Sequence, residues 1–298
     1  MSIGPDITIS SAELTATIAR SGAELTSLRR RDGLELLWQG DPASWPEQAP
    51  ILFPLLGPLT NQTLRHRGQA YQIPPHGFAK SRTFDLIEQS DSRCLLRISD
   101  DEQIRSMYPF SFQFDVEYEI RANALLSTIH VTNTGNETMP CDVGFHPGFQ
   151  WPLKPDVDKD AHWIVFEDPE PAPIRRGIDD PIFLYGDPHP TPVSGDVLQL
   201  TESLFEDQAI VFDRIRSRSI IYKADSGPSL QIDFPDCPYL ALWMRPGANY
   251  ICIEPWQGLP VEHGWDGEYL DKPGAAHIEP GAARSWRLGV TVTGQART

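Results

Sequence analysis

Proline is the feature that most restricts how this chain can fold. The 298 residues include 28 prolines, roughly twice the usual frequency of about 5%. Because proline lacks a backbone donor and its ring clashes with the preceding helical turn, long helices have little room in this sequence. The proline content therefore favours strands joined by turns and ordered loops.

Alternating apolar and polar residues predict those strands. In Ser111–Ile120 (SFQFDVEYEI) every second side chain is apolar, which is the period of a strand with one buried face. Residues 121–124 read as a turn into a second strand, Leu125–Asn133, so the two should form a hairpin. Further strands are expected at Ile7–Ile9, Leu14–Ala19, Ala23–Leu28, Leu34–Trp38, Arg93–Ile98, Trp163–Phe166, Ile210–Phe212, Ser219–Lys223, Leu230–Phe234, Tyr239–Met244, Tyr250–Glu254 and Trp286–Val292.

Helix is expected only in short pieces. The segment Ser99–Glu102 matches a capping box and opens a turn or two before Pro109. A second short helix is expected at Thr201–Phe205, and Lys154–Pro192, rich in Pro and Asp, should form long ordered loops. Many short strands with few helices predict an all-β fold, a large sandwich or barrel. No composition shift or low-complexity linker divides the chain, so we expect one domain over residues 1–298.

Charge and cysteine content narrow the partners and the compartment. The chain has 25 basic and 41 acidic residues, a net charge of −16, which repels a phosphate backbone and makes nucleic acid an unexpected partner. Its four cysteines are scattered without metal-site spacing, which favours the reducing cytoplasm. Neither a signal peptide in Met1–Ile18 nor an apolar run of 18 residues is present, so no membrane association is expected.

Three short segments each place an ionisable residue beside Gly or Pro and next to aromatic residues. They are Pro75–Lys80 (PHGFAK), Gly144–Phe149 (GFHPGF) and Cys252–Gly258 (CIEPWQG). Gly and Pro set unusual backbone turns, and aromatic rings offer flat faces to the apolar C–H faces of a sugar. Taken singly, each signal is weak, because a histidine in such a loop is more often structural and a glutamate ending a strand is more often exposed.

Together the three segments resemble the aldose 1-epimerase, or galactose mutarotase-like, family, and more narrowly its short lactose-operon-type bacterial branch. The resemblance runs nearly end to end, and it also includes Leu14–Leu28, Asp32-Gly33, Leu36–Pro42, Trp45, Pro50–Pro54, Gly57, Gly68 and Tyr71. It implies a β-supersandwich and a cofactor-independent isomerase that interconverts the α- and β-anomers of a free hexose or related aldose. The implied partner is a small-molecule sugar, and the protein itself would be a monomer or homodimer.

The resemblance also implies roles for particular residues. Glu254 would be the base that takes the C1 hydroxyl proton, and His146 the acid that protonates the ring oxygen. His76 would hydrogen-bond the sugar near the reacting centre, and Asp207 is the best match to an aspartate that grips sugar hydroxyls. For the apolar wall that raises the pKa of such a glutamate, the candidates are Trp256 and Phe145. We expect no metal, because the sequence shows no third ligand near the two histidines at metal spacing.

One departure from the family pattern concerns a sugar-contacting arginine. Many relatives carry it directly after the glycine that matches Gly57, or a few residues on, where this chain has Pro58 and Gln62. The candidates to replace it are Arg65, Arg67, Lys80 and Arg82, of which we assign Arg65 and Lys80 to substrate binding. Two alternatives stay open: a non-catalytic carbohydrate-binding protein on the same scaffold, and a hexose-phosphate mutarotase, which needs these basic residues to converge on the site.

Overall fold

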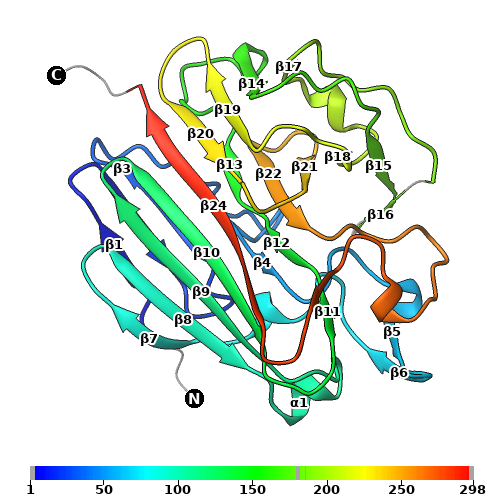
Figure 1. Cartoon of the computed structure of the whole chain (residues 1–298). Helices are drawn as coiled ribbons and strands as arrows, with labels where there is room; N and C mark the ends of the chain where they lie inside the picture. Colours follow the sequence, from blue (N-terminus) through cyan, green and yellow to red (C-terminus); the bar gives the residue numbers. More distant parts are fainter. Residues whose placement is uncertain (1–3, 179–181, 185, 295–298) are drawn as a thin grey trace.

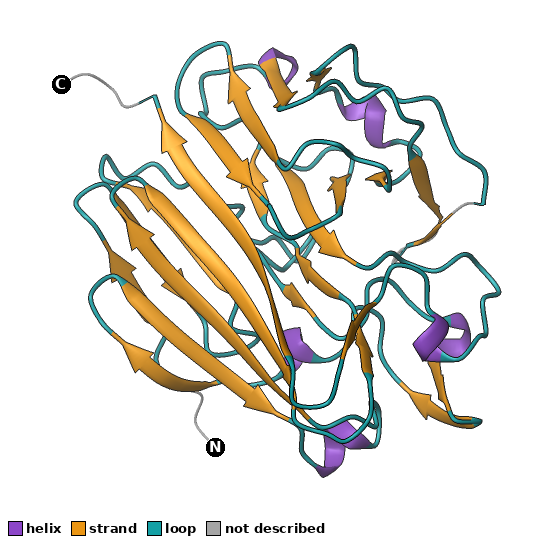
Figure 2. Ribbon diagram, in the orientation of Figure 1, coloured by secondary structure: helices purple, strands orange, loops and turns teal. Residues whose placement is uncertain are grey.

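The computed structural model describes residues 4–178, 182–184 and 186–294. Antiparallel strands form most of it, and helix is confined to single turns in the loops (Figure 1 and Figure 2). Two large sheets face each other across one hydrophobic core. The predicted all-β architecture with few short helices is confirmed.

The larger sheet has nine described strands, and β8, β9, β10 and β24 run side by side on the left of Figure 1. Its order is β17 (Val197–Gln199), β14 (His162–Phe166), β19 (Ser219–Ala224), β20 (Ser229–Asp233), β24 (Ala283–Thr293), β10 (Ala124–Asn133), β9 (Phe112–Arg121), β8 (Arg93–Ser99) and β7 (Asp85–Gln89). The predicted hairpin is present as β9 and β10, which pair from Arg121 opposite Ala124. The apolar residues that alternate along β9 are all buried, as the period of two predicted.

The smaller of the two large sheets carries the site described below, and β22 is its central strand. Its order is β16 (Phe183–Leu184), β15 (Arg175–Ile178), β18 (Ile210–Phe212), β21 (Tyr239–Trp243), β22 (Tyr250–Gln257), β12 (Val143–Phe145) and β4 (Ile51–Leu52), with β13 (Gly148–Gln150) also pairing with β22. Every residue of β22 is buried. Such a strand shows no alternation, because both of its faces are covered.

Three small sheets and several single helical turns complete the described structure. The small sheets are β1 (Ile7–Ser10), β2 (Leu14–Ile18) and β3 (Leu25–Arg30); β11 (Met139–Cys141) and β23 (Ala276–Ile278); and β5 (Thr63–His66) and β6 (Gln69–Gln72). The helical turns are α1 (Glu102–Arg105), η1 (Thr60–Gln62), η2 (Ala79–Ser81), η3 (Lys159–Ala161), η4 (Glu202–Phe205) and η5 (Tyr269–Asp271). None of these turns has the length to cross a bilayer, and the part of the chain described contains no longer apolar helix.

Aromatic contacts join the two large sheets. The ring of Phe53, which follows β4, lies 4.4 Å from that of Phe114 on β9, measured between centroids. At the other end of the sandwich Phe166 on β14 lies 5.4 Å from Phe212 on β18. Removing one such ring leaves a cavity that typically costs about 3–5 kcal/mol, so these contacts hold the sheets in a fixed relation.

Three local predictions differ from the structure. Leu34–Trp38 forms only isolated bridges, because the Glu35 carboxylate accepts the amides of Leu28 and Leu37 and so replaces a strand partner. The proline-rich region Lys154–Pro192 contains β15 and β16 as well as the predicted strand near Trp163. The first short helix also begins later than the capping box suggested, since the capping side chain is that of Asp101.

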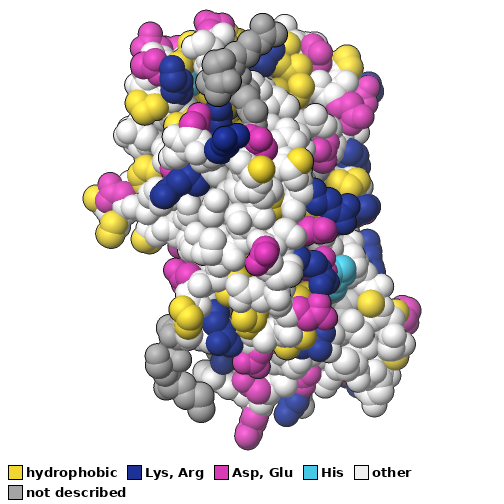
Figure 3. All heavy atoms as spheres, turned by 90° about the vertical axis from the view of Figure 1, so that its left-hand side faces the viewer, with side chains coloured by type: hydrophobic (Ala, Val, Ile, Leu, Met, Phe, Trp, Pro, Cys, Tyr) yellow, Lys and Arg dark blue, Asp and Glu magenta, His cyan; other side chains and the backbone are white. Residues whose placement is uncertain are grey.

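The surface mixes charges of both signs despite the acidic total. Figure 3 shows acidic and basic side chains interspersed over one face, with hydrophobic atoms only in small groups. Ion pairs cross between β8 and β9, where Arg97 contacts Asp115 at 2.6 Å and Arg93 contacts Glu117 at 2.9 Å. Such exposed or half-exposed pairs contribute only about 0–1 kcal/mol each.

One ion pair is completely buried in the protein. Lys272 and Asp142 are both fully buried, with Nζ and Oδ2 2.6 Å apart, and Asp142 Oδ2 also accepts the amide of Leu56. Lys272→Met should lower the free energy of unfolding by about 3–5 kcal/mol, since it leaves a buried carboxylate unpaired. Denaturant unfolding measures this, with Lys154→Met in an exposed pair as the control. A loss below about 1 kcal/mol would show that Asp142 needs no counter-charge.

Candidate active site

The site is built on β22, whose alternate residues Cys252, Glu254 and Trp256 share one face of the strand. Glu254 is 2% exposed. A buried carboxylate in the middle of a central strand is unusual, because it has no water to solvate its charge. The interpretation of Glu254 as an exposed surface residue is therefore wrong.

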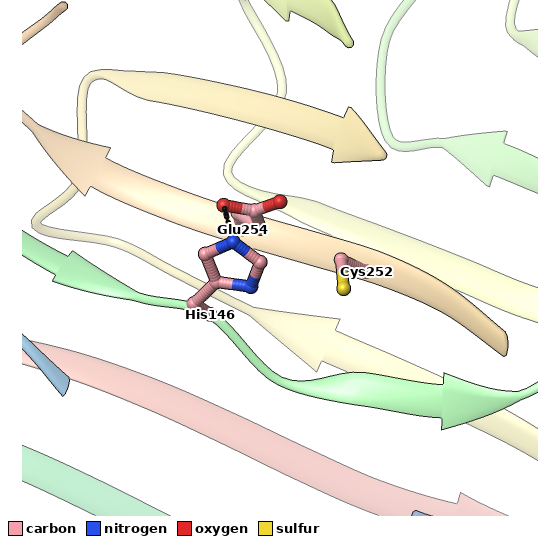
Figure 4. Close-up of side chains that lie close together, drawn as sticks. All are labelled: His146, Cys252 and Glu254. Atoms are coloured by element: carbon pink, nitrogen blue, oxygen red, sulfur yellow. Dashed lines mark ion pairs between the residues drawn. The ribbon is translucent and has the colours of Figure 1, made fainter. Parts of the chain in front are cut away.

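His146 reaches Glu254 because it lies between two short strands, β12 and β13, that pair with β22 just after and just before Glu254. Gly144 on β12 lies opposite Trp256, and Gly148 on β13 lies opposite Cys252. The two residues between these strands, His146 and Pro147, must then pass over Glu254. His146 Nε2 lies 3.2 Å from Glu254 Oε2, and a dashed line in Figure 4 marks this contact. The spacing between the two acid–base candidates is thus set by backbone pairing.

Burial acts in opposite directions on the two groups. It raises the pKa of Glu254 well above its ordinary value and lowers the pKa of His146 well below that of a free imidazole. Both shifts favour a pair that carries one proton and no net charge. Among the described residues, His146 Nδ1 is buried without a hydrogen-bond partner. Glu254 Oε2 is buried and accepts no hydrogen bond of good geometry there, although His146 Nε2 lies 3.2 Å away. Polar atoms left unpaired in this way are typical of a site that completes its bonding with a ligand.

His76 lies in a tight turn beside this pair. The turn needs positive φ at both His76 (62°) and Gly77 (72°), and a Cβ on Gly77 would fall 2.2 Å from the Phe53 carbonyl oxygen. His76 Nδ1 accepts the amide of Gly57, so the proton of the neutral ring is on Nε2. Burial, with a contribution from Lys80, lowers the pKa of His76 to about 3. His76 is therefore a neutral hydrogen-bond donor at ordinary pH.

A cavity of about 490 Å³ opens over these residues, within the usual range of about 300–1,000 Å³ for small-molecule sites. Its walls are largely aromatic and proline side chains: Trp45, Trp243, Trp256, Pro42, Pro46, Pro50 and Pro75. Its polar side chains are Ser44, Glu47, His76, Lys80, His146, Arg245 and Glu254. Of the eight residues singled out from the sequence, the structure brings five together here: His76, Lys80, His146, Glu254 and Trp256.

The other three do not line the cavity. Phe145 follows Gly144 on β12, and since Gly144 faces Trp256, Phe145 points to the opposite side of the sheet and into the core. Arg65 is exposed on β5, where its backbone pairs with that of Glu268. Asp207 is exposed, although Ala209, two residues on, lies in the wall. The apolar surroundings of Glu254 come from tryptophans, and Phe145 has no part in them.

The four basic candidates do not converge. Only Lys80 lines the cavity, where Nζ contacts Glu47 Oε1 at 2.8 Å. Arg67 instead pairs with Glu137, and Arg82 donates to the Gln103 side chain. The convergence of these four residues that a hexose-phosphate mutarotase would need is therefore not found in the cavity wall that the structure describes.

Sequence reasoning assigned no role to Trp45, Glu47, Trp243 and Arg245. The rings of Trp45 and Trp243 lie 5.1 Å and 5.9 Å from that of His146. Trp45 could have been singled out, since Pro46 and the ionisable Glu47 follow it directly, a combination similar to the other three motifs. Trp243 carries no local signal, because the pairing of β21 with β22 brings it to the site. Arg245 lies in the loop that follows β21.

Cys252 lies next to the acid–base pair and completes a group of metal-ligating residue types. Its sulfur and the nearest ligand atoms of His146 and Glu254 lie within 4.8 Å of one another (Figure 4). Cys252 is far from His76 and His146 in the sequence, and the pairing of β13 with β22 brings it near His146. Burial raises the pKa of the Cys252 thiol well above its ordinary value.

A buried Glu–His pair under an aromatic cavity can move protons to and from a small polar ring. Comparison with known proteins agrees with this chemistry. The family model described as aldose 1-epimerase matches residues 5–275, and the chain belongs to this family. It is 32% identical over 283 residues to the plasmid-encoded protein LacX of Lactococcus lactis subsp. lactis, which covers 92% of this chain and 95% of LacX.

Solved structures agree with this assignment. A galactose mutarotase-like protein from Lactobacillus casei superposes with a TM-score of 0.90 at 30% identity, over 97% of this chain and 100% of that one. A galactose mutarotase related enzyme from Lactobacillus acidophilus gives a TM-score of 0.87 at 28% identity, over 97% of each chain. The expected galactose mutarotase-like fold is thereby confirmed.

Proposed function

We propose that this protein is an aldose 1-epimerase that interconverts the α- and β-anomers of a free hexose or related aldose. The observation that carries the proposal is the contact of 3.2 Å between His146 and Glu254 at the floor of the cavity. Membership of the aldose 1-epimerase family supports it independently.

The reaction needs one proton removed from one sugar oxygen and one delivered to another. Glu254 takes the proton from the C1 hydroxyl while His146 gives its proton to the ring oxygen, and the C1–O5 bond breaks to leave an aldehyde. After rotation about C1–C2, the C5 hydroxyl attacks the other face of the aldehyde. Its proton returns to His146, and Glu254 protonates the new C1 oxygen. The pair ends with the proton count with which it began, so the cycle needs no cofactor.

The remaining polar groups hold the sugar in place. The Nε2 proton of His76 can be donated to a hydroxyl or to the ring oxygen. Trp45, Trp243 and Trp256 cover the C–H faces of the ring and keep water from the open-chain aldehyde. The pair formed by Lys80 and Glu47 offers a donor and an acceptor to hydroxyls away from C1.

Polarimetry tests the proposal directly. Freshly dissolved α-anomers of glucose, galactose and related aldoses are followed with and without protein, and the spontaneous rate is the baseline. Acceleration of at least one aldose supports the function. If the protein binds sugars and accelerates none, it is a carbohydrate-binding protein instead.

The pH profile of kcat/KM should be broad. The ordinary pKa values of glutamate and histidine side chains are 4.5 and 6.5. An exposed pair would therefore consist of a carboxylate and an imidazolium only at a pH between these two values. Burial raises the first and lowers the second, so the pair gains its second proton only below the lowered pKa of His146. It loses its single proton only above the raised pKa of Glu254. Stopped-flow polarimetry should therefore show no loss of kcat/KM as the pH rises through 6.5, and such a loss would refute the shared-proton state.

Neutral aldoses should be better substrates than their 6-phosphates. Of the four basic candidates only Lys80 lies in the described cavity wall, where it pairs with Glu47, and Arg67 and Arg82 are bound elsewhere. Arg245 also lines the cavity, but the Glu47 carboxylate in the same wall repels a phosphate. A phosphate would gain little there that offsets its desolvation. A comparison of kcat/KM for glucose and glucose 6-phosphate measures this, and a higher value for the phosphate would favour a hexose-phosphate mutarotase.

A further inference from the structure

Three side chains of metal-ligating types meet at β22 from two segments of the chain. Cys252 and Glu254 share one face of this strand, and His146 lies between β12 and β13, which pair with it there. One ligand atom from each of the three side chains lies within 4.8 Å of the other two (Figure 4). Backbone pairing therefore holds an imidazole nitrogen, a carboxylate oxygen and a thiol sulfur around one point.

The separation of His146 and Glu254 already suits a tetrahedral ion. Two ligands at Zn–N and Zn–O lengths of about 2.0–2.2 Å lie roughly 3.4 Å apart in tetrahedral geometry, and His146 Nε2 lies 3.2 Å from Glu254 Oε2. The Cys252 sulfur, within 4.8 Å of its neighbours, has to approach by about 1 Å to reach a normal Zn–S length. Because this sulfur turns about the Cα–Cβ bond alone, a small rotation supplies that approach.

Two of these side chains have bonding capacity that the described part of the protein leaves unfilled. His146 Nδ1 is buried without a hydrogen-bond partner, and Glu254 Oε2 is buried and accepts no hydrogen bond of good geometry. A buried polar atom left in this state costs free energy. A cation that takes the place of the proton between the two side chains binds the Glu254 oxygen directly and removes that cost.

The charges at this point match those of a divalent cation. Glu254 and Cys252 are both buried, with exposed fractions of 2% and 0%. A carboxylate and a thiolate together carry two negative charges, so a divalent ion leaves the buried site without net charge. When the ion binds, the thiol proton and the single proton of the Glu–His pair pass to the solvent.

The donor atoms also select the kind of metal. Nitrogen, sulfur and one carboxylate oxygen suit Zn²⁺ and similar thiophilic ions, whereas Ca²⁺ and Mg²⁺ bind through oxygen. His146 and Glu254 line the cavity of about 490 Å³. An ion can therefore enter through the cavity, and its fourth coordination position faces that space.

We propose that His146, Cys252 and Glu254 bind a thiophilic divalent cation such as Zn²⁺, and that the bound ion inhibits the protein. The ion occupies the nitrogen and the oxygen that would otherwise exchange protons with the sugar, so the occupied protein has neither acid nor base. The inhibition rests on the epimerase function proposed above, whereas the metal site does not.

Cadmium tests the sulfur ligand directly, because a cadmium–thiolate bond gives an ultraviolet charge-transfer absorption that a thiol lacks. Metal-free wild-type protein should develop this absorption with one equivalent of Cd²⁺, and calorimetry should give a Kd for Zn²⁺ of about 1 μM or lower. Cys252→Ser replaces the thiol with a hydroxyl of nearly the same size. It should lose the absorption and bind Zn²⁺ at least about 100-fold more weakly, and Cys252→Ala should behave in the same way.

Cys94→Ser is the matched control, because Cys94 is another fully buried free cysteine, on β8. It should keep both the absorption and the affinity for Zn²⁺. Glu254→Gln should weaken Zn²⁺ binding, since the amide carries no charge to offset that of the ion. The site is refuted if wild-type protein shows no cadmium–thiolate absorption, if Cys252→Ser retains it, or if Glu254→Gln binds Zn²⁺ as tightly as wild type.

Polarimetry on the same samples separates this proposal from the proposed function. If metal-free protein accelerates mutarotation, one equivalent of Zn²⁺ should stop it, a chelator should restore it, and Cys252→Ser should resist the ion. Cadmium–thiolate absorption in a protein that accelerates no sugar supports the site and rejects the epimerase. Mutarotation that Zn²⁺ leaves unchanged, without the absorption, does the reverse.

Discussion

Glu254→Gln protein should fold normally and accelerate mutarotation at least about 100-fold less than wild type, a loss of roughly 3 kcal/mol of transition-state stabilisation. Glutamine has nearly the shape of glutamate and keeps a hydrogen bond to the sugar, but it cannot take the C1 hydroxyl proton. The burial of Glu254 makes the neutral amide easy to accommodate. Sugar affinity should therefore change little while kcat falls.

The matched control is Glu47→Gln, which changes a second glutamate in the same cavity. Glu47 contacts Lys80 and no acid–base residue, so its loss should affect KM more than kcat. Polarimetry gives the rates and calorimetry the affinity. Wild-type kcat in folded Glu254→Gln protein would show that the base has been assigned wrongly.

His146→Asn should cause a loss of similar size, because the ring oxygen then leaves without a proton donor. Asparagine removes the titratable nitrogen that faces Glu254 at 3.2 Å. Combined with Glu254→Gln, it should lower kcat by much less than the product of the two single losses, since both groups act in one proton-transfer step.

His130→Asn is the control for this series, because His130 is a partly exposed histidine on β10, outside the cavity. It should leave kcat unchanged. Double-mutant losses that multiply in full would mean that Glu254 and His146 act in separate steps.

The sequence predicted the strands that have one buried and one solvent-exposed face. β9 alternates from Phe112 to Ile120, and its register with β10 follows from the turn between them. Strands of two or three residues, such as β4 and β12, leave no periodic signal because they are too short to repeat. Leu34–Trp38 has the pattern of a strand but forms a loop, because a side-chain carboxylate accepts amides that a strand partner would otherwise bind.

Local sequence motifs identified the residues on which the proposed chemistry rests. They did not identify the other residues of the cavity wall. Glu254, His146 and His76 each lie directly beside Gly or Pro, which is visible in the sequence. Pro255 does not end the strand after Glu254 as expected, because β22 continues to Gln257. The period of two would also have excluded Phe145, because it alternates with Gly144 and His146. Trp243 comes to the cavity through the pairing of β21 with β22. No local pattern records that pairing.

β12 and β13 pair with β22 just after and just before Glu254. As a result, substitutions in the surrounding loops and changes in the length of β22 should have different effects on the site. Substitutions in the loops around Trp45 and Arg245 can reshape the opening of the cavity, since loops absorb change that strands do not. Such loop substitutions should leave the distance from Glu254 to His146 unchanged, because the backbone pairing of β12 and β13 with β22 fixes it. A single-residue insertion or deletion in β22 would turn Glu254 to the opposite face of the sheet. Libraries that aim at new sugars should therefore vary loop residues freely and keep the length of Tyr250–Gln257 constant.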